Sequence, residues 1–213
     1  MSKKSELLNV IEEYRRQQEL FKSKVTEIES RQYLMQEGKE IEIEKIATPF
    51  TEVAQNAQNR ALEILNSGIE ALEKKWRDNS TGRLTDSNYQ IGLANTIKMI
   101  EAGAITNQED FKNIINTYKD DYNALATIEN LLGLDHPELA VLIPKDNREY
   151  NKKALNDLRN NIGKYIGPYS IRESLTMSLL GIIDFINTRL EDDLTIIPWE
   201  EVKKIDYGRI TYN

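Results

Sequence analysis

Side chains suited to acid–base, nucleophilic or metal chemistry are few in this sequence. His136 is the only histidine and cysteine is absent. His136 precedes Pro137 in an expected turn, with no serine nucleophile at motif spacing. Because a metal cluster or an acid–base pair needs further ligands or a nucleophile, we predict no catalytic and no metal-ligating residue there.

Clusters of acidic residues are the second place where chemistry could lie. Asp120-Asp121 and Glu191-Asp192-Asp193 lack the alternating ligand spacing of a calcium loop. The helix dipole favours acids near a helix start, which explains the first cluster, and a solvated helix end explains the second. The glycines are isolated, so no phosphate-binding loop is predicted. We expect no enzyme and no cofactor, with a carboxylate-only enzyme kept as an alternative.

The composition excludes some partners and favours helices. Hydrophobic residues make up 39% of the 213 residues and charged residues 30%, with a net charge of −7. That balance supplies a core but opposes binding to nucleic acid, which depends on neutralising phosphates. The most apolar window, Leu175 to Ile186, contains Asp184 and is shorter than a bilayer span. With no signal-peptide core, we expect a cytoplasmic product on synthesis and no membrane partner.

The N-terminal stretch carries the most regular pattern. Hydrophobic and amide side chains alternate at steps of four and three over four heptads, as in a helix that packs along a partner helix. The seam positions are Leu7, Ile11, Tyr14, Gln18, Phe21, Val25, Ile28, Gln32 and Met35. An isolated helix of this kind is not stable, so the seam must pair with a second copy or another protein, or fold back on its own chain. Gln18 and Gln32 form polar layers that can fix register and partner number.

The chain between residues 36 and 48 allows two interpretations. A four-residue shift in the heptad phase is compatible with a continuous helix that is locally unwound. Alternatively, Gly38 ends the first helix and Thr48 caps a second that begins at Pro49 and runs to about Arg77. Ile41 and Ile43 alternate with glutamates, as in a strand, but a lone strand has no partner, so we expect a helix with a kink or a short break.

Shorter helices are expected after the turn at residues 78–82. Asp86 caps one that ends at Gly103, and a capping box from Thr106 to Glu109 opens the next. Asp120 or Asp121 begins a third, ended by Gly133. A turn at residues 137–143, a helix at residues 148–165 and a strongly apolar helix opened by a capping box at residues 170–173 complete the bundle.

The last segment differs from the rest in its aromatic content. Trp199, Tyr207, Ile210 and Tyr212 lie in a stretch without long periodicity. Free tails are usually polar. We therefore predict a docking tail, which binds either its own bundle or a neighbouring subunit by strand or groove insertion.

The order of parts resembles small helical coiled-coil proteins encoded among the head and tail assembly genes of tailed bacteriophages that infect Gram-positive bacteria. The resemblance covers about the first 130 residues. After the charged coiled-coil stretch, Leu84-Thr85-Asp86 opens a helix with Tyr89-Gln90 and Leu93-Ala94. The sequence YKDDYNAL follows at residues 118–125. The resemblance implies a scaffolding or minor virion component without catalysis, and it assigns no functional residues.

Together these features predict an all-α protein with a long N-terminal coiled-coil-type helix, a helical bundle and an extended C-terminal tail. The expected divisions are residues 1–47, 48–194 and 195–213. The leading hypothesis is a non-enzymatic structural or assembly protein of a phage virion, a capsid accessory or scaffold-like component in a homo-oligomer or larger assembly. Its partners would be copies of itself, capsid proteins or other virion proteins, bound through the heptad seam and the C-terminal tail. The alternative is a cytoplasmic helical adaptor or inhibitor that binds a single host or phage protein.

Overall fold

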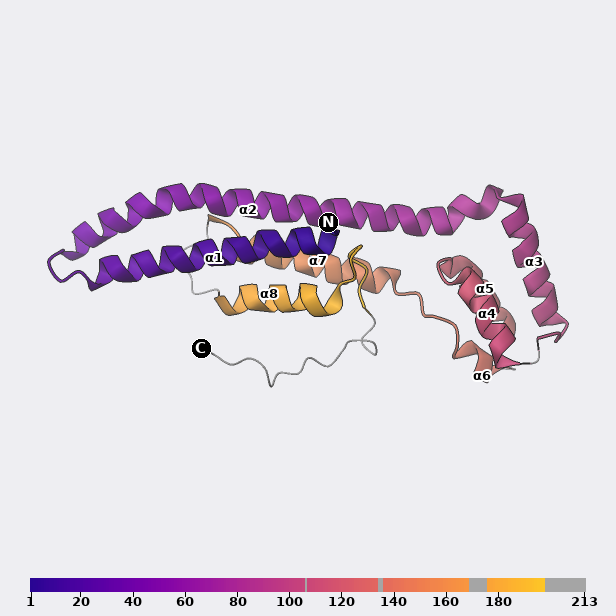
Figure 1. Cartoon of the computed structure of the whole chain (residues 1–213). Coiled ribbons are helices and arrows are strands. Elements are labelled where there is room, and N and C mark those ends of the chain that lie inside the picture. Colours follow the sequence, from indigo (N-terminus) through magenta and orange to yellow (C-terminus); the bar gives the residue numbers. More distant parts are fainter. Residues whose placement is uncertain (106, 134–135, 169–175, 198–213) are drawn as a thin grey trace. The chain divides into compact units, whose positions relative to one another are not determined.

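The computed structural model describes residues 1–105, 107–133, 136–168 and 176–197. Within these ranges the chain is built of helices, and its one extended pairing is an antiparallel bridge between Leu190 and Ile196. The predicted all-α fold class is confirmed. The helices are α1 (Lys3–Ser30), α2 (Gln36–Asn79), the 3₁₀ helix η1 (Thr81–Thr85), α3 (Ser87–Glu101), α4 (Gln108–Tyr118), α5 (Tyr122–Leu132), α6 (Pro137–Ala140), α7 (Arg148–Tyr165) and α8 (Thr176–Arg189) (Figure 1).

The chain forms two compact units. The first comprises Met1–Ile69 and Tyr150–Asn213, and the second comprises Glu70–Glu149. Helix α2 contributes residues 36–69 to the first unit and residues 70–79 to the second. The division predicted from sequence, at residues 47 and 194, follows changes in pattern and stays a prediction.

The ends of the first two helices differ from the sequence prediction. Helix α1 ends at Ser30, before Gln32 and Met35, and Gly38 lies at the start of α2 instead of ending α1. Helix α2 continues through Pro49, which lacks the amide hydrogen for one helical bond but leaves the neighbouring bonds in place. Thr48 is no N-cap, because its hydroxyl donates to the Glu44 carbonyl at 3.0 Å.

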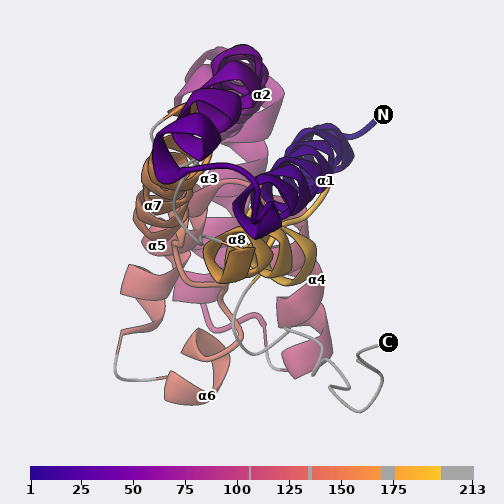
Figure 2. The same cartoon turned by 90° about the vertical axis from the view of Figure 1, so that its left-hand side faces the viewer.

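Helix α1 folds back on its own chain in the first unit. Helix α8 lies alongside α1, and α7 lies alongside α2 (Figures 1 and 2). Lys4 Nζ donates to the carbonyls of Asn187 and Leu190, at 3.0 and 2.6 Å, so α8 ends where α1 begins and the two run antiparallel. Leu7, Ile11 and several α8 side chains are completely buried, which covers this half of the seam.

Two contacts close the first unit around residues 190–197. The side-chain oxygen of Asn151, itself fully buried in α7, accepts from the Ile196 amide at 2.7 Å. Gly68 in α2 faces Leu194, and a Cβ added at Gly68 would clash with the Leu194 side chain. Any larger residue at position 68 would therefore require the Leu194 side chain to shift.

The second unit has its own core, supplied mainly by α4 and α5. Its buried members are Phe111, Ile115, Tyr118, Ala124, Leu125, Ile128, Leu132 and Ile143. The predicted caps at Asp86 and Asp121 are confirmed, since their carboxylates accept amide hydrogens in the first turns of α3 and α5. Helix α4 differs, because Asn107 caps it by accepting from the Asp110 amide at 2.8 Å. Thr106 and the capping box expected at residues 170–173 lie outside the described residues.

Candidate functional site

The residues with the greatest capacity for chemistry are not assembled into a catalytic group. His136 Nδ1 lies 3.4 Å from Glu138 Oε1 in an exposed turn before α6, and both side chains are more than half exposed. In the described part of the chain, no three acidic or imidazole side chains are grouped so that they could hold a metal ion. The local chemistry at His136 is that of a surface pair.

The first acidic cluster has a structural role. Asp121 is buried, and its Oδ1 accepts from the amides of Asn123 and Ala124 at 3.0 and 3.1 Å. Its Oδ2 accepts from the Tyr89 hydroxyl at 2.7 Å. Burial and this hydrogen bond raise the pKa of Tyr89 to about 12. The carboxylate therefore joins α3 to the start of α5, and the predicted helix-cap explanation is confirmed.

The predicted seam positions are distributed between core and surface. Six of them are buried within the chain: Leu7, Ile11, Tyr14, Gln18, Phe21 and Ile28. Val25 is half-buried, while Gln32 and Met35 lie beyond α1 and are exposed. The Gln18 layer lacks a full set of partners, because its Nε2 is buried with no hydrogen-bond partner among the described residues. The predicted tail residues Trp199, Tyr207, Ile210 and Tyr212 lie outside the described residues.

The end of the α1–α2 hairpin contains its own small core. Phe50 stacks on Phe21 with ring centroids 4.8 Å apart, and on Tyr14 at 6.2 Å. Arg31 binds Glu27 on α1 and Glu42 on α2, and Lys39 Nζ donates to the Glu29 carbonyl at 2.6 Å. The hydrogen bond to Glu27 contributes most to the raised pKa of Arg31. Aromatic packing and these polar links hold the two helices together at this end.

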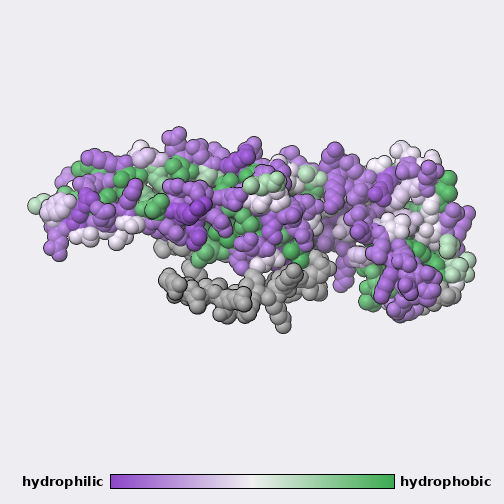
Figure 3. All heavy atoms as spheres, in the orientation of Figure 1, coloured by the Kyte–Doolittle hydropathy of each residue, from purple (hydrophilic) through white to green (hydrophobic). Residues whose placement is uncertain are grey.

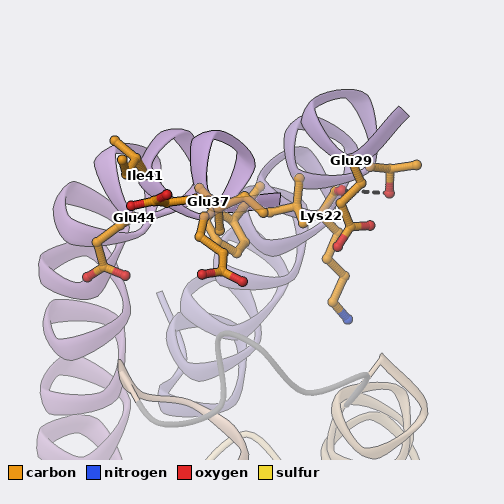
Figure 4. Close-up of a pocket in the computed structure, with 10 residues that line it drawn as sticks. Lys22, Glu29, Glu37, Ile41 and Glu44 are labelled. Carbon is orange, nitrogen blue, oxygen red and sulfur yellow. Dashed lines mark hydrogen bonds between the residues drawn. The ribbon is translucent and has the colours of Figure 1, made fainter. Parts of the chain in front are cut away.

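A groove lies on one flank of this hairpin. It has a volume of about 920 Å³ and is lined by side chains of both helices: Phe21, Lys22, Val25, Thr26 and Glu29 from α1, and Glu37, Glu40, Ile41, Ile43 and Glu44 from α2. Figure 4 shows Lys22 and Glu29 extending from α1, and Glu37 and Glu44 from α2, toward the same side. Ile41 is 52% exposed. Apolar side chains between glutamates thus form an open surface.

Figure 3 shows hydrophobic surface, in green, between hydrophilic side chains along α1 and α2. The groove mixes these two kinds of side chain, with four carboxylates and one ammonium group. It lacks the convergent polar groups that fix a small substrate and the grouped donors that bind a metal. Protein interfaces also combine apolar contact with charged side chains.

Most of the groove was not predicted from the sequence. Phe21 and Val25 were predicted as seam residues, whereas the four glutamates of the groove were not singled out. The available signal was the alternation of Ile41 and Ile43 with glutamates at the point where the heptad phase changes. That alternation places an isoleucine outside the α1–α2 core, which becomes clear once α2 is known to begin at Gln36.

By fold, the protein belongs to the all-α class, and its groove defines a candidate docking site. No family model matches the chain, and neither a curated protein nor a solved structure is found to match it. Among the described helices, none has both the length and the apolar composition required to cross a membrane.

Proposed function

We propose that the protein is a non-enzymatic structural or assembly protein that acts through helix-mediated contacts with other proteins, as a component of a phage virion. The observation that carries the proposal is the open groove on the α1–α2 hairpin, lined by apolar side chains and four glutamates. A partner protein that packs in the groove would bury the exposed part of its apolar side chains. The order of parts along the sequence supports placing that partner in a phage particle.

In such a role, affinity comes from many copies of one weak contact. One groove of this size would bind weakly, since a stable interface buries well over 1,000 Å² in total. Many copies held in one assembly raise the effective concentration of each contact, so that weak contacts suffice. The C-terminal tail, residues 195–213, would provide a second contact, which stays a prediction.

Mass spectrometry of purified particles of the encoding phage tests the virion role. The chain should be present at a stoichiometry that survives a density-gradient step, and cross-links should join α1 or α2 to another virion protein. If the chain stays in the unassembled fraction of the lysate, the virion role is wrong.

The second candidate function is a cytoplasmic helical adaptor or inhibitor that binds one host or phage protein. It is favoured by the burial of Leu7, Ile11 and Tyr14 against the chain's own helices, since this half of the seam needs no second copy. An adaptor should be a monomer or dimer by light scattering and absent from particles. The virion component should be present in particles, whether or not it self-associates when isolated.

A further inference from the structure

The described part of α8 lies along only part of the α1 seam. Helix α1 has 28 residues and α8 has 14, so at 1.5 Å per residue they are about 42 and 21 Å long. Because α8 ends beside Lys4, its described part reaches only to about the middle of α1. Beyond that point Phe21 and Ile28 are still buried, at 6 and 5% exposure, and Val25 is half-buried.

The groove lies on this less covered half of α1. Successive residues are rotated by 100° around a helix, so Val25 and Glu29 lie on one flank of Phe21 and Leu20 and Lys24 on the other. The residues that line the hollows on each side agree with this division. Lys4, which contacts the end of α8, lies about five full helical turns before Lys22, so the groove is on the flank of α1 that faces α8.

The charges that line the groove indicate what kind of helix would bind there. The groove carries Glu29, Glu37, Glu40 and Glu44 against a single lysine, Lys22. The opposite flank is different: Lys24 and Lys45 lie beside the Arg31 ion pairs with Glu27 and Glu42. A second copy that presented the same groove would place carboxylates against carboxylates, which opposes a symmetric dimer there. A helix with an apolar stripe and basic flanks matches both the apolar side chains and the glutamates of the groove.

We propose that the acidic groove on α1 and α2 binds a basic amphipathic helix of a partner protein, which packs against the half of α1 that lies beyond the described part of α8. This deepens the proposed function by naming the chemistry of the partner. The anchors of such a helix, at spacings of three and four residues, would contact Val25, Ile41 and Ile43, and its lysine or arginine side chains would lie against the glutamates.

The test uses the full chain and a fluorescein-labelled peptide of about 14 residues, long enough to make about four helical turns. The peptide has leucine at steps of three and four, and lysine at the flanking positions. A second peptide carries glutamate in place of every lysine. Fluorescence anisotropy at low salt and again near physiological salt should show binding of the lysine peptide alone, weakened by salt.

Two matched pairs of variants locate the site. Glu40→Gln/Glu44→Gln removes two groove carboxylates, and Glu52→Gln/Glu70→Gln removes two exposed carboxylates of the same helix outside the groove. We expect the first to weaken binding about five-fold and the second less than about two-fold, because each exposed charge pair contributes modestly. Ile41→Ser should weaken binding further than Leu20→Ser, since these residues are 52 and 59% exposed but lie on different flanks.

Circular dichroism should give the same helical signal for all four variants, since the changed side chains are exposed. Equal weakening by both carboxylate pairs would mean general attraction of a cationic peptide to an acidic protein and would overturn the proposal. Absence of binding to the folded wild type would overturn it too, as would a dimer, found by light scattering, that excludes the peptide. A peptide that binds at the groove while the chain is absent from particles would reject the virion role and leave the groove as an adaptor site.

Discussion

The Tyr89–Asp121 contact allows a stability prediction to be worked through from its geometry. Asp121→Ala removes two N-cap hydrogen bonds at the start of α5 and the acceptor of the Tyr89 hydroxyl. Loss of an N-cap costs about 1 kcal/mol. Loss of the charged hydrogen bond adds about 1–1.5 kcal/mol, at the low end because Tyr89 is half-buried and water can replace part of it. The second unit should lose about 2–2.5 kcal/mol.

Two milder variants separate the contribution of the helix cap from that of the tyrosine hydrogen bond to this loss of stability. Asp121→Asn keeps an oxygen for the cap, and should cost less than about 1 kcal/mol. Tyr89→Phe keeps the ring, which stands edge-on to Tyr118 at 5.8 Å, and removes only the hydroxyl. Combined with Asp121→Ala, it should give a coupling energy of about 1 kcal/mol in a double-mutant cycle.

The assay should report on the second unit alone, because the chain has two compact units and need not unfold in one step. Hydrogen exchange followed by mass spectrometry of peptides from Tyr122–Leu132 meets this need. A faster exchange in Asp121→Ala, confined to Glu70–Glu149, is the expected result. A coupling energy near zero would refute the claim that the phenol–carboxylate bond contributes to stability.

The same contact predicts a dependence on pH. The pKa of Tyr89 is raised to about 12, so the folded state holds the phenolic proton more tightly than the unfolded state does. This contribution is complete below pH of about 10, the pKa of an unperturbed tyrosine, and is lost as the pH rises toward 12. The pH titration of tyrosinate absorbance should lose a component with a pKa of about 12 in Tyr89→Phe. A titration curve of Tyr89→Phe that keeps this component would contradict the assignment.

Three further substitutions test the packing of the first unit. Gln18→Met replaces a buried amide whose Nε2 has no partner in the described structure with an apolar side chain of similar size, and should raise the free energy of unfolding by about 1 kcal/mol in urea titrations. Asn151→Ala leaves a buried main-chain amide without its acceptor and should lower the free energy of unfolding by about 1–3 kcal/mol. Asn160→Ala, at an exposed position of α7, should change the free energy of unfolding little. Gly68→Ala forces a side chain into the 190–197 segment and should cost about 1–3 kcal/mol, whereas Gly181→Ala meets no atom within 4 Å and should raise stability by about 0.5–1 kcal/mol.

The sequence was most informative where local chemistry determines a boundary. The helix expected at residues 148–165 matches α7, and the aspartate caps of α3 and α5 are in place, because a capping carboxylate acts within a few residues. Pro49 misled the prediction for the same reason. Proline at the first position of a helix is locally ideal, yet burial of Ala47 and Phe50 on either side continues α2 through it. Tertiary packing here outweighs one missing hydrogen bond.

The groove was beyond prediction from sequence because it depends on helix lengths in three dimensions. The heptad pattern indicates that α1 must be covered, but it does not distinguish α8 of the same chain from a helix of another. The antiparallel placement of α8 and its described length leave Val25 half-buried. The exposure of Ile41 follows from the start of α2 at Gln36, which the sequence left open between a stutter and a break.

The two halves of α1 therefore bear differently on the assembly hypothesis. The first half is sealed by the chain's own helices, so deleting residues 1–36 would unfold the first unit and could not separate self-association from folding. The second half offers the groove, where exposed side chains can be changed without loss of the core. Light scattering of the Ile41→Ser variant is the cleaner test, because Ile41 is 52% exposed and outside the aromatic stack. If the wild type forms an oligomer that Ile41→Ser reduces to monomer, the groove is a self-association surface and the basic partner helix is wrong. If both are monomers, the groove is left for a different protein.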